Sequence, residues 1–176
     1  LMRYLRQLLE NDKKLAPFKI LSTEKEVSLP FPVESKGRTI DVTLKGTIDR
    51  LDEVNIDGLT RMRVVDYKTG GEPEKPAGVE HLFLVSEKRP HYVFQTFVYS
   101  LIMAAETRMP LVPSLFFVHK SAGGEYDPCI FMGERTKKRP VLCFQEHAAK
   151  FEVLLRRLIA EIFNPDLPFE PTPVVA

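Results

Sequence analysis

Two stretches of alternating residues joined by an Asp-Gly turn constrain the fold of this chain more than any other feature. Over residues 38–51, apolar side chains occupy alternate positions, as in a strand with one buried face. Asp57 and Gly58 form a dipeptide typical of tight hairpin turns, and a second strand is predicted over residues 61–68. We therefore expect these two strands to pair antiparallel within one sheet.

The other periodicities predict helices and strands in an order typical of an α/β fold. The expected elements are a helix over residues 2–14, strands over 19–29, 38–51 and 61–68, a helix over 90–106, strands over 111–120 and 129–132, and a helix over 144–163. This order predicts a central mixed β-sheet flanked by helices.

Length and composition suit a single domain. The 176 residues are 44% hydrophobic, enough for one buried core, and we expect residues 1–176 to form one domain cut from a longer polypeptide. A formal net charge of +1 indicates neither a nucleic-acid nor a membrane partner for the chain as a whole. Cys129 and Cys143 lack metal-site spacing and are expected to be ordinary buried thiols, which favours a cytoplasmic protein. No apolar run is long enough to predict a membrane span.

Charged residues interrupt the apolar face of the second strand where that strand ends. One face of the strand predicted over residues 61–68 carries Met62, Val64, Asp66 and Lys68. This apolar face therefore ends in two adjacent charges, within the segment VVDYKTGG at residues 64–71. Burying an unpaired charge is costly, so either this strand end is solvated or the two charges have a role. Asp49, near the end of the preceding strand, is predicted to approach Asp66.

Paired aspartates next to a lysine favour chemistry at a phosphate. Two carboxylates ~4 Å apart repel by about 4 kcal/mol at an effective dielectric of 20, so a cation is expected between them. Mg²⁺ uses one or two carboxylates and completes its shell with water and phosphate oxygens. Lys68 could then hold the attacking water or offset developing charge. Asp49, Asp66 and Lys68 together predict hydrolysis of a phosphodiester.

The following helix carries a polar pair on an otherwise apolar surface. Gln95 and Tyr99 are four residues apart and share a stripe with Tyr92. Such a pair could hydrogen-bond a phosphate or orient an acidic ligand. A role as satisfied polar groups in the core stays open.

Three segments resemble, in order and spacing, the GxxDR, (D/E)xK and QxxxY motifs of the PD-(D/E)XK nuclease superfamily. They are GTIDRLD at residues 46–52, VVDYKTG at 64–70 and QTFVY at 95–99. The chain is most similar to the RecB-like nuclease domains found at the C-terminus of bacterial helicase-nucleases. The resemblance implies a restriction-endonuclease-like α/β core, dependence on Mg²⁺ or Mn²⁺, and cleavage of DNA.

The resemblance also implies a role for each matching residue. Asp49 and Asp66 become metal ligands, the Tyr67 carbonyl a further ligand, Lys68 the catalytic lysine, and Gln95 and Tyr99 a pair that supports the site or faces DNA. Glu24 resembles an acidic metal ligand that many relatives carry on the first strand, and Glu26 competes with it for that position. Many relatives also carry a metal-binding histidine on an upstream helix, whereas the first histidine here is His81.

The expected function is therefore that of a metal-dependent exonuclease-type domain in a recombination or repair helicase-nuclease. Its expected partners are DNA ends or single strands and the helicase part of the parent protein, with no membrane. Two alternatives stay open: a catalytically inactive module that binds DNA or a partner protein of the complex, and a small-molecule phosphodiesterase. The basic run at residues 134–140 is interpreted as a solvated loop with a weaker case for DNA contact. Arg50 is expected to be structural and to pair with Asp52.

Overall fold

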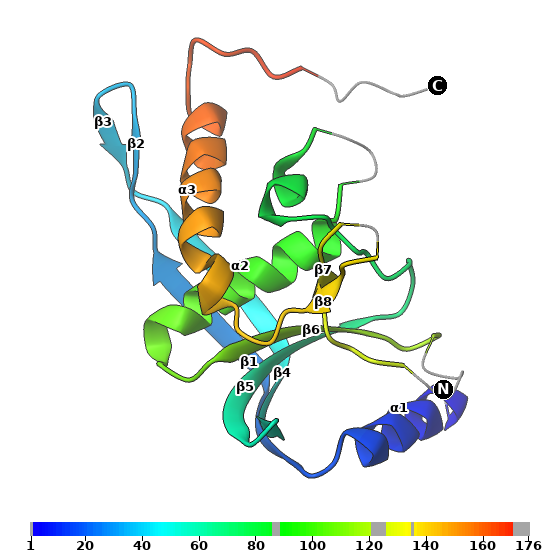
Figure 1. Ribbon diagram of the computed structural model, residues 1–176. Coiled ribbons are helices and arrows are strands. Elements are labelled where there is room, and N and C mark those ends of the chain that lie inside the picture. The colour runs from blue at the N-terminus through cyan, green and yellow to red at the C-terminus, as the bar shows by residue number, and fades with distance from the viewer. Residues whose placement is uncertain (1, 86–88, 121–125, 135, 171–176) are drawn as a thin grey trace, which may run out of the picture.

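A four-stranded mixed sheet forms the centre of the molecule. The computed structural model describes residues 2–85, 89–120, 126–134 and 136–170 (Figure 1). The sheet has the order β1-β4-β5-β6. Its strands are β1 (Phe18–Pro30), β4 (Thr43–Ile56), β5 (Leu59–Lys68) and β6 (Leu111–Phe117). β4 pairs antiparallel with both β1 and β5, whereas β5 and β6 run parallel, which confirms the predicted mixed sheet.

The predicted hairpin between β4 and β5 is confirmed. Ile56 pairs with Leu59, so Asp57 and Gly58 form a two-residue turn. Both turn residues have positive φ angles, 53° and 77°, as the type of turn that matches strand twist requires. The side-chain oxygen of Asn55 accepts a hydrogen bond of 3.0 Å from the Gly58 N–H and closes the turn.

Helices cover both faces of the sheet. Helix α2 (His91–Glu106) lies across one face and contacts all four strands. Helix α3 (Gln145–Ile162) packs on α2 and on the short 3-10 helix η1 (Val79–Phe83). Helix α1 (Met2–Leu15) lies on the other side of the sheet (Figure 1). The three predicted helices are therefore confirmed, with bounds within one residue of those expected.

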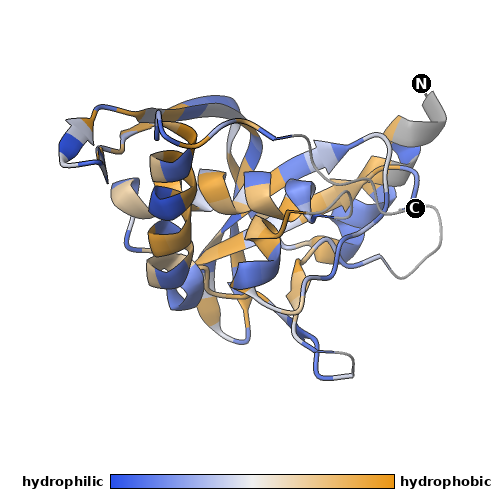
Figure 2. Ribbon diagram, turned by 90° about the horizontal axis from the view of Figure 1, so that it is seen from above, coloured by the Kyte–Doolittle hydropathy of each residue, from blue (hydrophilic) through white to orange (hydrophobic). Residues whose placement is uncertain are grey.

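The core fills the space between the sheet and the helices α2 and α3. Phe97 of α2 is fully buried, and its ring meets those of Phe144 and Phe151 edge-on at centroid distances of 5.2 and 5.4 Å. Ile48 and Val64 cover the sheet side of this cluster. Figure 2 shows hydrophobic residues where these layers meet and hydrophilic residues on the outer turns of the helices.

The strand predicted over residues 38–51 is wrong in its extent. Residues 38–40 form β3 (Arg38–Ile40), which pairs with β2 (Val33–Ser35) through a turn at Lys36 and Gly37, both with positive φ. β4 begins only at Thr43 and continues to Ile56. The alternating pattern continues across the break because both strands keep the same two-residue period, so the pattern alone cannot locate it.

Two further strand predictions need correction. The strand expected over residues 111–120 ends at Phe117, and the strand expected over 129–132 is reduced to β7 (Phe131–Met132). β7 pairs with β8 (Arg139–Pro140), which the sequence did not predict because a strand of two residues carries no periodic signal. Among the described helices, none combines the length and apolar character needed to cross a membrane.

Both cysteines are free thiols that are half-buried rather than buried as expected. Burial, with the nearby charge of Asp127, raises the pKa of Cys129 to about 12. Its thiol is therefore protonated and unreactive at neutral pH.

Candidate functional site

Asp66 and Lys68 lie at the C-terminal end of β5, on the face that α2 covers. The Lys68 Nζ atom is 2.6 Å from Asp66 Oδ2, and the two side chains are largely enclosed, with exposures of 14% for Lys68 and 5% for Asp66. β5 carries them there because Met62 and Val64 anchor the same face in the core. The two charges are therefore paired with each other and partly desolvated.

Asp49 reaches the same strand end from β4. The last paired residues of the β4–β5 ladder are Arg50 and Val65, so Asp49 is the first β4 residue beyond the ladder. Its Oδ2 atom accepts a hydrogen bond of 2.6 Å from the backbone N–H of Tyr67. The Asp49 carboxylate thus replaces the missing ladder bond and lies beside the Asp66–Lys68 pair.

A chain of hydrogen bonds connects Lys68 to helix α2. Lys68 Nζ donates to Gln95 Oε1 at 2.8 Å, and Gln95 Nε2 donates to the Tyr99 hydroxyl at 2.9 Å. The Nζ atom also lies 4.8 Å from the centre of the Tyr92 ring, within the range of a cation–π contact. Gln95 therefore holds Lys68 and is itself bound by Tyr99, and the same hydrogen bonds satisfy the polar groups of both side chains.

Gly46 of β4 lets Tyr99 occupy its place in this chain. A Cβ atom at Gly46 would lie 2.4 Å from Tyr99 Cε1, far inside van der Waals contact. The glycine that opens the GTIDR segment is thus needed for the close approach of α2 to the sheet.

Gly46→Ala is expected to lower the free energy of unfolding by about 1–3 kcal/mol, the usual effect of overpacking a core. Displacing Tyr99 is also expected to disorder Gln95 and Lys68 and to slow any reaction at the site. Urea denaturation measures the first effect. Gly70→Ala is the matched control, because a Cβ there meets nothing within 4 Å; equal losses in both variants would contradict the assignment.

Burial raises the pKa of Asp66 above its ordinary value. The ammonium group of Lys68 opposes this shift, and the charge of Asp49 adds to the rise. The two carboxylates are therefore close enough to repel, and the ionised form of Asp66 is held at an energetic cost.

The donor set suits a hard divalent cation. Asp66 Oδ2 is buried and receives no aligned hydrogen bond from the described residues, although Lys68 pairs with it electrostatically. The N–H and C=O of a strand residue point to the same side, so the Tyr67 carbonyl also faces the side where β4 has left the ladder. Two carboxylates and one carbonyl leave the remaining positions to water and phosphate, as Mg²⁺ prefers.

Glu24 is not brought into this set. It is exposed and has a φ of 48°, at the position of β1 opposite Asp49, between the pairs Thr23–Arg50 and Lys25–Ile48. Glu26 is exposed too and pairs with Thr47. Within the described part of the chain, no three His, Cys, Asp or Glu side chains form a group that could hold a metal. Any metal at this site would therefore be held by Asp49, Asp66 and the Tyr67 carbonyl.

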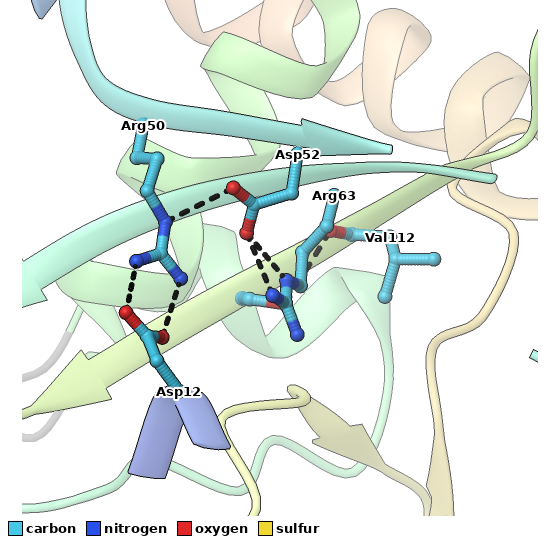
Figure 3. Close-up of polar contacts among 6 residues, drawn as sticks. Asp12, Arg50, Asp52, Arg63 and Val112 are labelled. Carbon is cyan, nitrogen blue, oxygen red and sulfur yellow. Dashed lines mark hydrogen bonds and ion pairs between the residues drawn. The ribbon is translucent and has the colours of Figure 1, made fainter. Parts of the chain in front are cut away.

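A second charged cluster lies on the opposite face of the sheet, between the sheet and helix α1 (Figure 3). Arg50 binds both carboxylate oxygens of Asp12, at 2.8 and 3.0 Å, and its Nε atom lies 3.1 Å from Asp52. Arg63 binds the other oxygen of Asp52 at 2.7 and 3.0 Å. The expected Arg50–Asp52 pair is confirmed, but the sequence did not indicate Asp12 or Arg63, because no local spacing connects them.

Glu74 is another residue that the sequence did not single out. Helix α2 has no side-chain cap from its own preceding residue. Glu74, from the long segment after β5, accepts a 3.0 Å hydrogen bond from the Val93 N–H instead, and it lies 3.3 Å from His91. The loop is thereby attached to the helix end that carries Tyr92, where a carboxylate is favoured by the helix dipole.

The basic run is exposed where it is described. Lys137, Lys138 and Arg139 are all exposed, in agreement with a solvated segment, and Arg135 lies outside the described residues.

Comparison with known proteins agrees with this geometry. The family model of the PD-(D/E)XK nuclease superfamily matches residues 1–174. A 29-residue stretch is 55% identical to one of the subunits of an ATP-dependent helicase/deoxyribonuclease from Clostridium perfringens (strain SM101 / Type A). That match covers 16% of this chain and only 2% of the length of the relative. The mixed sheet between helices is the restriction-endonuclease-like α/β fold, and the chain belongs to the PD-(D/E)XK nuclease superfamily.

Proposed function

We propose that this chain is a metal-dependent deoxyribonuclease domain that hydrolyses phosphodiester bonds in DNA. The observation that carries the proposal is the meeting of Asp49, Asp66 and Lys68 at the one point where β4 leaves β5. These groups combine two neighbouring carboxylates that could hold a cation with an oriented ammonium group. A purely structural strand end has no need for two carboxylates that repel each other.

Each residue would have a distinct task. Asp49, Asp66 and the Tyr67 carbonyl would hold Mg²⁺ or Mn²⁺, which when bound polarises the phosphate and acidifies water. The ammonium group of Lys68 would hold the attacking water or balance charge that develops on the phosphate oxygens. Gln95 accepts from Lys68 and donates to Tyr99, so it restricts the lysine to one orientation.

The biological setting is proposed from the Clostridium perfringens relative and from composition. The name of that relative combines a helicase with a deoxyribonuclease. We infer that the domain acts as an exonuclease on DNA ends or single strands, together with a helicase region, in recombination or repair. The two free thiols suit a reducing compartment such as the cytoplasm.

A cleavage assay on labelled DNA tests the proposal. Linear single-stranded, linear double-stranded and closed circular DNA are incubated with the protein in Mg²⁺, Mn²⁺ or EDTA. We expect cleavage of linear DNA in either metal, none in EDTA, and little on circles. Cleavage of closed circular DNA would contradict the assignment as an exonuclease but would still support a nuclease.

The inactive-module alternative has one observation in its favour, the lack of a third acidic or histidine ligand among the described residues. DNA binding that is independent of metal and is never followed by cleavage would support this alternative. Hydrolysis of a small phosphodiester without any action on DNA would instead favour a small-molecule phosphodiesterase.

A further inference from the structure

The candidate site lies where backbone pairing no longer holds β4 and β5 together. Arg50 and Val65 are the last paired residues, and Asp49, Asp66 and Tyr67 all follow that point. One hydrogen bond, from the Tyr67 N–H to Asp49, joins the two strands on the site face. The relative position of the two aspartates must therefore depend on further contacts beyond the ladder.

Arg50 supplies such contacts on the opposite face of the sheet. It directly follows Asp49 in the chain, and its guanidinium group lies 5.6 Å from the centre of the Tyr67 ring. The guanidinium group also lies 5.2 Å from the centre of the Phe18 ring. Arg50 thus contacts β5 through the residue that separates Asp66 from Lys68, while its own backbone carries Asp49.

The orientation of this guanidinium group is set by helix α1. Asp12 binds it through two parallel hydrogen bonds, a geometry that only arginine can form (Figure 3). Asp52 lies 3.1 Å from the Nε atom of Arg50 and is itself fully buried. The side chains of Leu5 and Leu9 are 47% and 61% exposed, so these two leucines contribute little to holding α1 on the sheet. The ion pair of Asp12 with Arg50 is thus one connection between α1 and the strand that carries the site.

We propose that Arg50 is a positioning residue of the candidate site, through which the docking of α1 by Asp12 sets the distance between Asp49 and the end of β5. The inference deepens the proposed function and rests on it, since Asp49 is taken as a metal ligand. Arg50 itself faces away from the site and touches neither metal nor DNA. Its effect is transmitted through the backbone at Asp49 and the ring of Tyr67.

Arg50→Lys tests this proposal, with Arg63→Lys as the matched control. Both arginines are buried, both bind Asp52 and both lie over Phe18, so both changes disturb the same cluster. Of the two arginines, Arg50 is the one that adjoins Asp49 and lies over the ring of Tyr67. If Arg50 contributed only to the stability of the fold, the two variants would give the same readouts when compared at the same free energy of unfolding.

The first readout is hydrogen exchange of the Tyr67 amide in metal-free protein. We expect exchange at least tenfold faster in Arg50→Lys, relative to amides at the far end of the β4–β5 ladder, and no such change in Arg63→Lys. The second readout is Mn²⁺ binding followed by electron paramagnetic resonance. We expect at least tenfold weaker binding in Arg50→Lys, the usual scale for a residue that supports a metal ligand, and less than twofold in Arg63→Lys.

Asp12→Asn extends the test to α1 and serves if Arg50→Lys fails to fold. Asp12 is partly exposed, so its loss is tolerated better than a change at Arg50. We expect the same direction of change in both readouts, whereas Glu10→Gln, which breaks only an exposed pair with Lys13 on the same helix, is expected to change neither.

Equal effects of Arg50→Lys and Arg63→Lys, or an unchanged Tyr67 amide in Asp12→Asn, would overturn the positioning role. The amide exchange needs neither metal nor DNA. The Tyr67 amide can therefore respond to the variants as expected even if the wild-type protein cleaves no DNA. That outcome would reject the proposed function and keep the positioning role of Arg50.

Discussion

Asp66→Asn is expected to abolish metal-dependent cleavage and to leave the folded protein at least as stable as the wild type. Removal of a carboxylate ligand weakens the binding of the cation by several kcal/mol. The same loss of stabilisation in the transition state lowers the rate of cleavage by about 10³-fold or more. Asparagine keeps the shape of the side chain and can still accept a hydrogen bond from Lys68. The variant therefore separates catalysis from folding.

The stability part of this prediction follows from the sign of the pKa shift. Burial, followed by the charge of Asp49, raises the pKa of Asp66 in the folded state, while Lys68 only partly offsets this rise. The folded protein thus binds a proton at Asp66 more tightly than the unfolded chain does, and its stability falls as the pH rises through that range. At neutral pH the ionised carboxylate destabilises the fold, so its replacement by a neutral amide relieves that penalty.

Thermal unfolding in EDTA, Mn²⁺ titration and a cleavage assay measure the three effects of Asp66→Asn. Asp57→Asn serves as the control, since it replaces an exposed aspartate in the turn at the other end of β5 and keeps a good turn residue. A variant that loses stability strongly in the absence of metal would show that Asp66 is a structural ion-pair partner of Lys68. Retained cleavage would remove Asp66 from the site.

Lys68→Ala is expected to reduce cleavage by about 10²–10³-fold, the range seen when one group that stabilises developing charge is removed. Metal binding is expected to persist, because both aspartates remain and lose a competing cation. This combination distinguishes Lys68 from a ligand: the lysine variant binds Mn²⁺ but does not cleave, whereas the Asp66 variant does neither.

Single-turnover cleavage at saturating Mn²⁺ measures the effect of Lys68→Ala, and Lys13→Ala is the control. Lys13 is an exposed lysine on α1 that forms an ion pair with Glu10. Unchanged cleavage in Lys68→Ala would refute the assignment of Lys68 as the catalytic lysine. Lost metal binding in that variant would show instead that the lysine holds the two strand ends together.

The β4–β5 hairpin and the adjacent charges of Asp66 and Lys68 could be predicted from sequence, because both depend on residues close in the chain. The dipeptide at Asp57 and Gly58 specifies a turn through its own backbone preferences. Likewise, the two-residue period of β5 places Asp66 and Lys68 on the face of Val64 before any partner is known. The three helices followed from the same kind of local pattern.

The break between β3 and β4 was not accessible, because it depends on which neighbour each segment pairs with. Residues 38–40 pair with β2, while β4 pairs with β1, and both choices preserve the alternating pattern. The need for a glycine at position 46 could not be derived from sequence either. A glycine inside a strand often marks a close backbone approach, but only the packing of α2 identifies Tyr99 as the neighbour.

By itself, the sequence determined which residues form the candidate site: a strand that ends in an acid and a lysine, an earlier aspartate, and a glutamine and a tyrosine one helical turn apart. These follow from residue type and short spacing. Only the tertiary structure decided that the β4–β5 ladder ends at Arg50, that Gln95 holds Lys68, and that Asp12 of α1 holds Arg50 from the other side of the sheet. The physical reason is that charges gain or lose free energy according to their burial and their partners, and partners 27 and 38 residues away are chosen by packing rather than by local pattern.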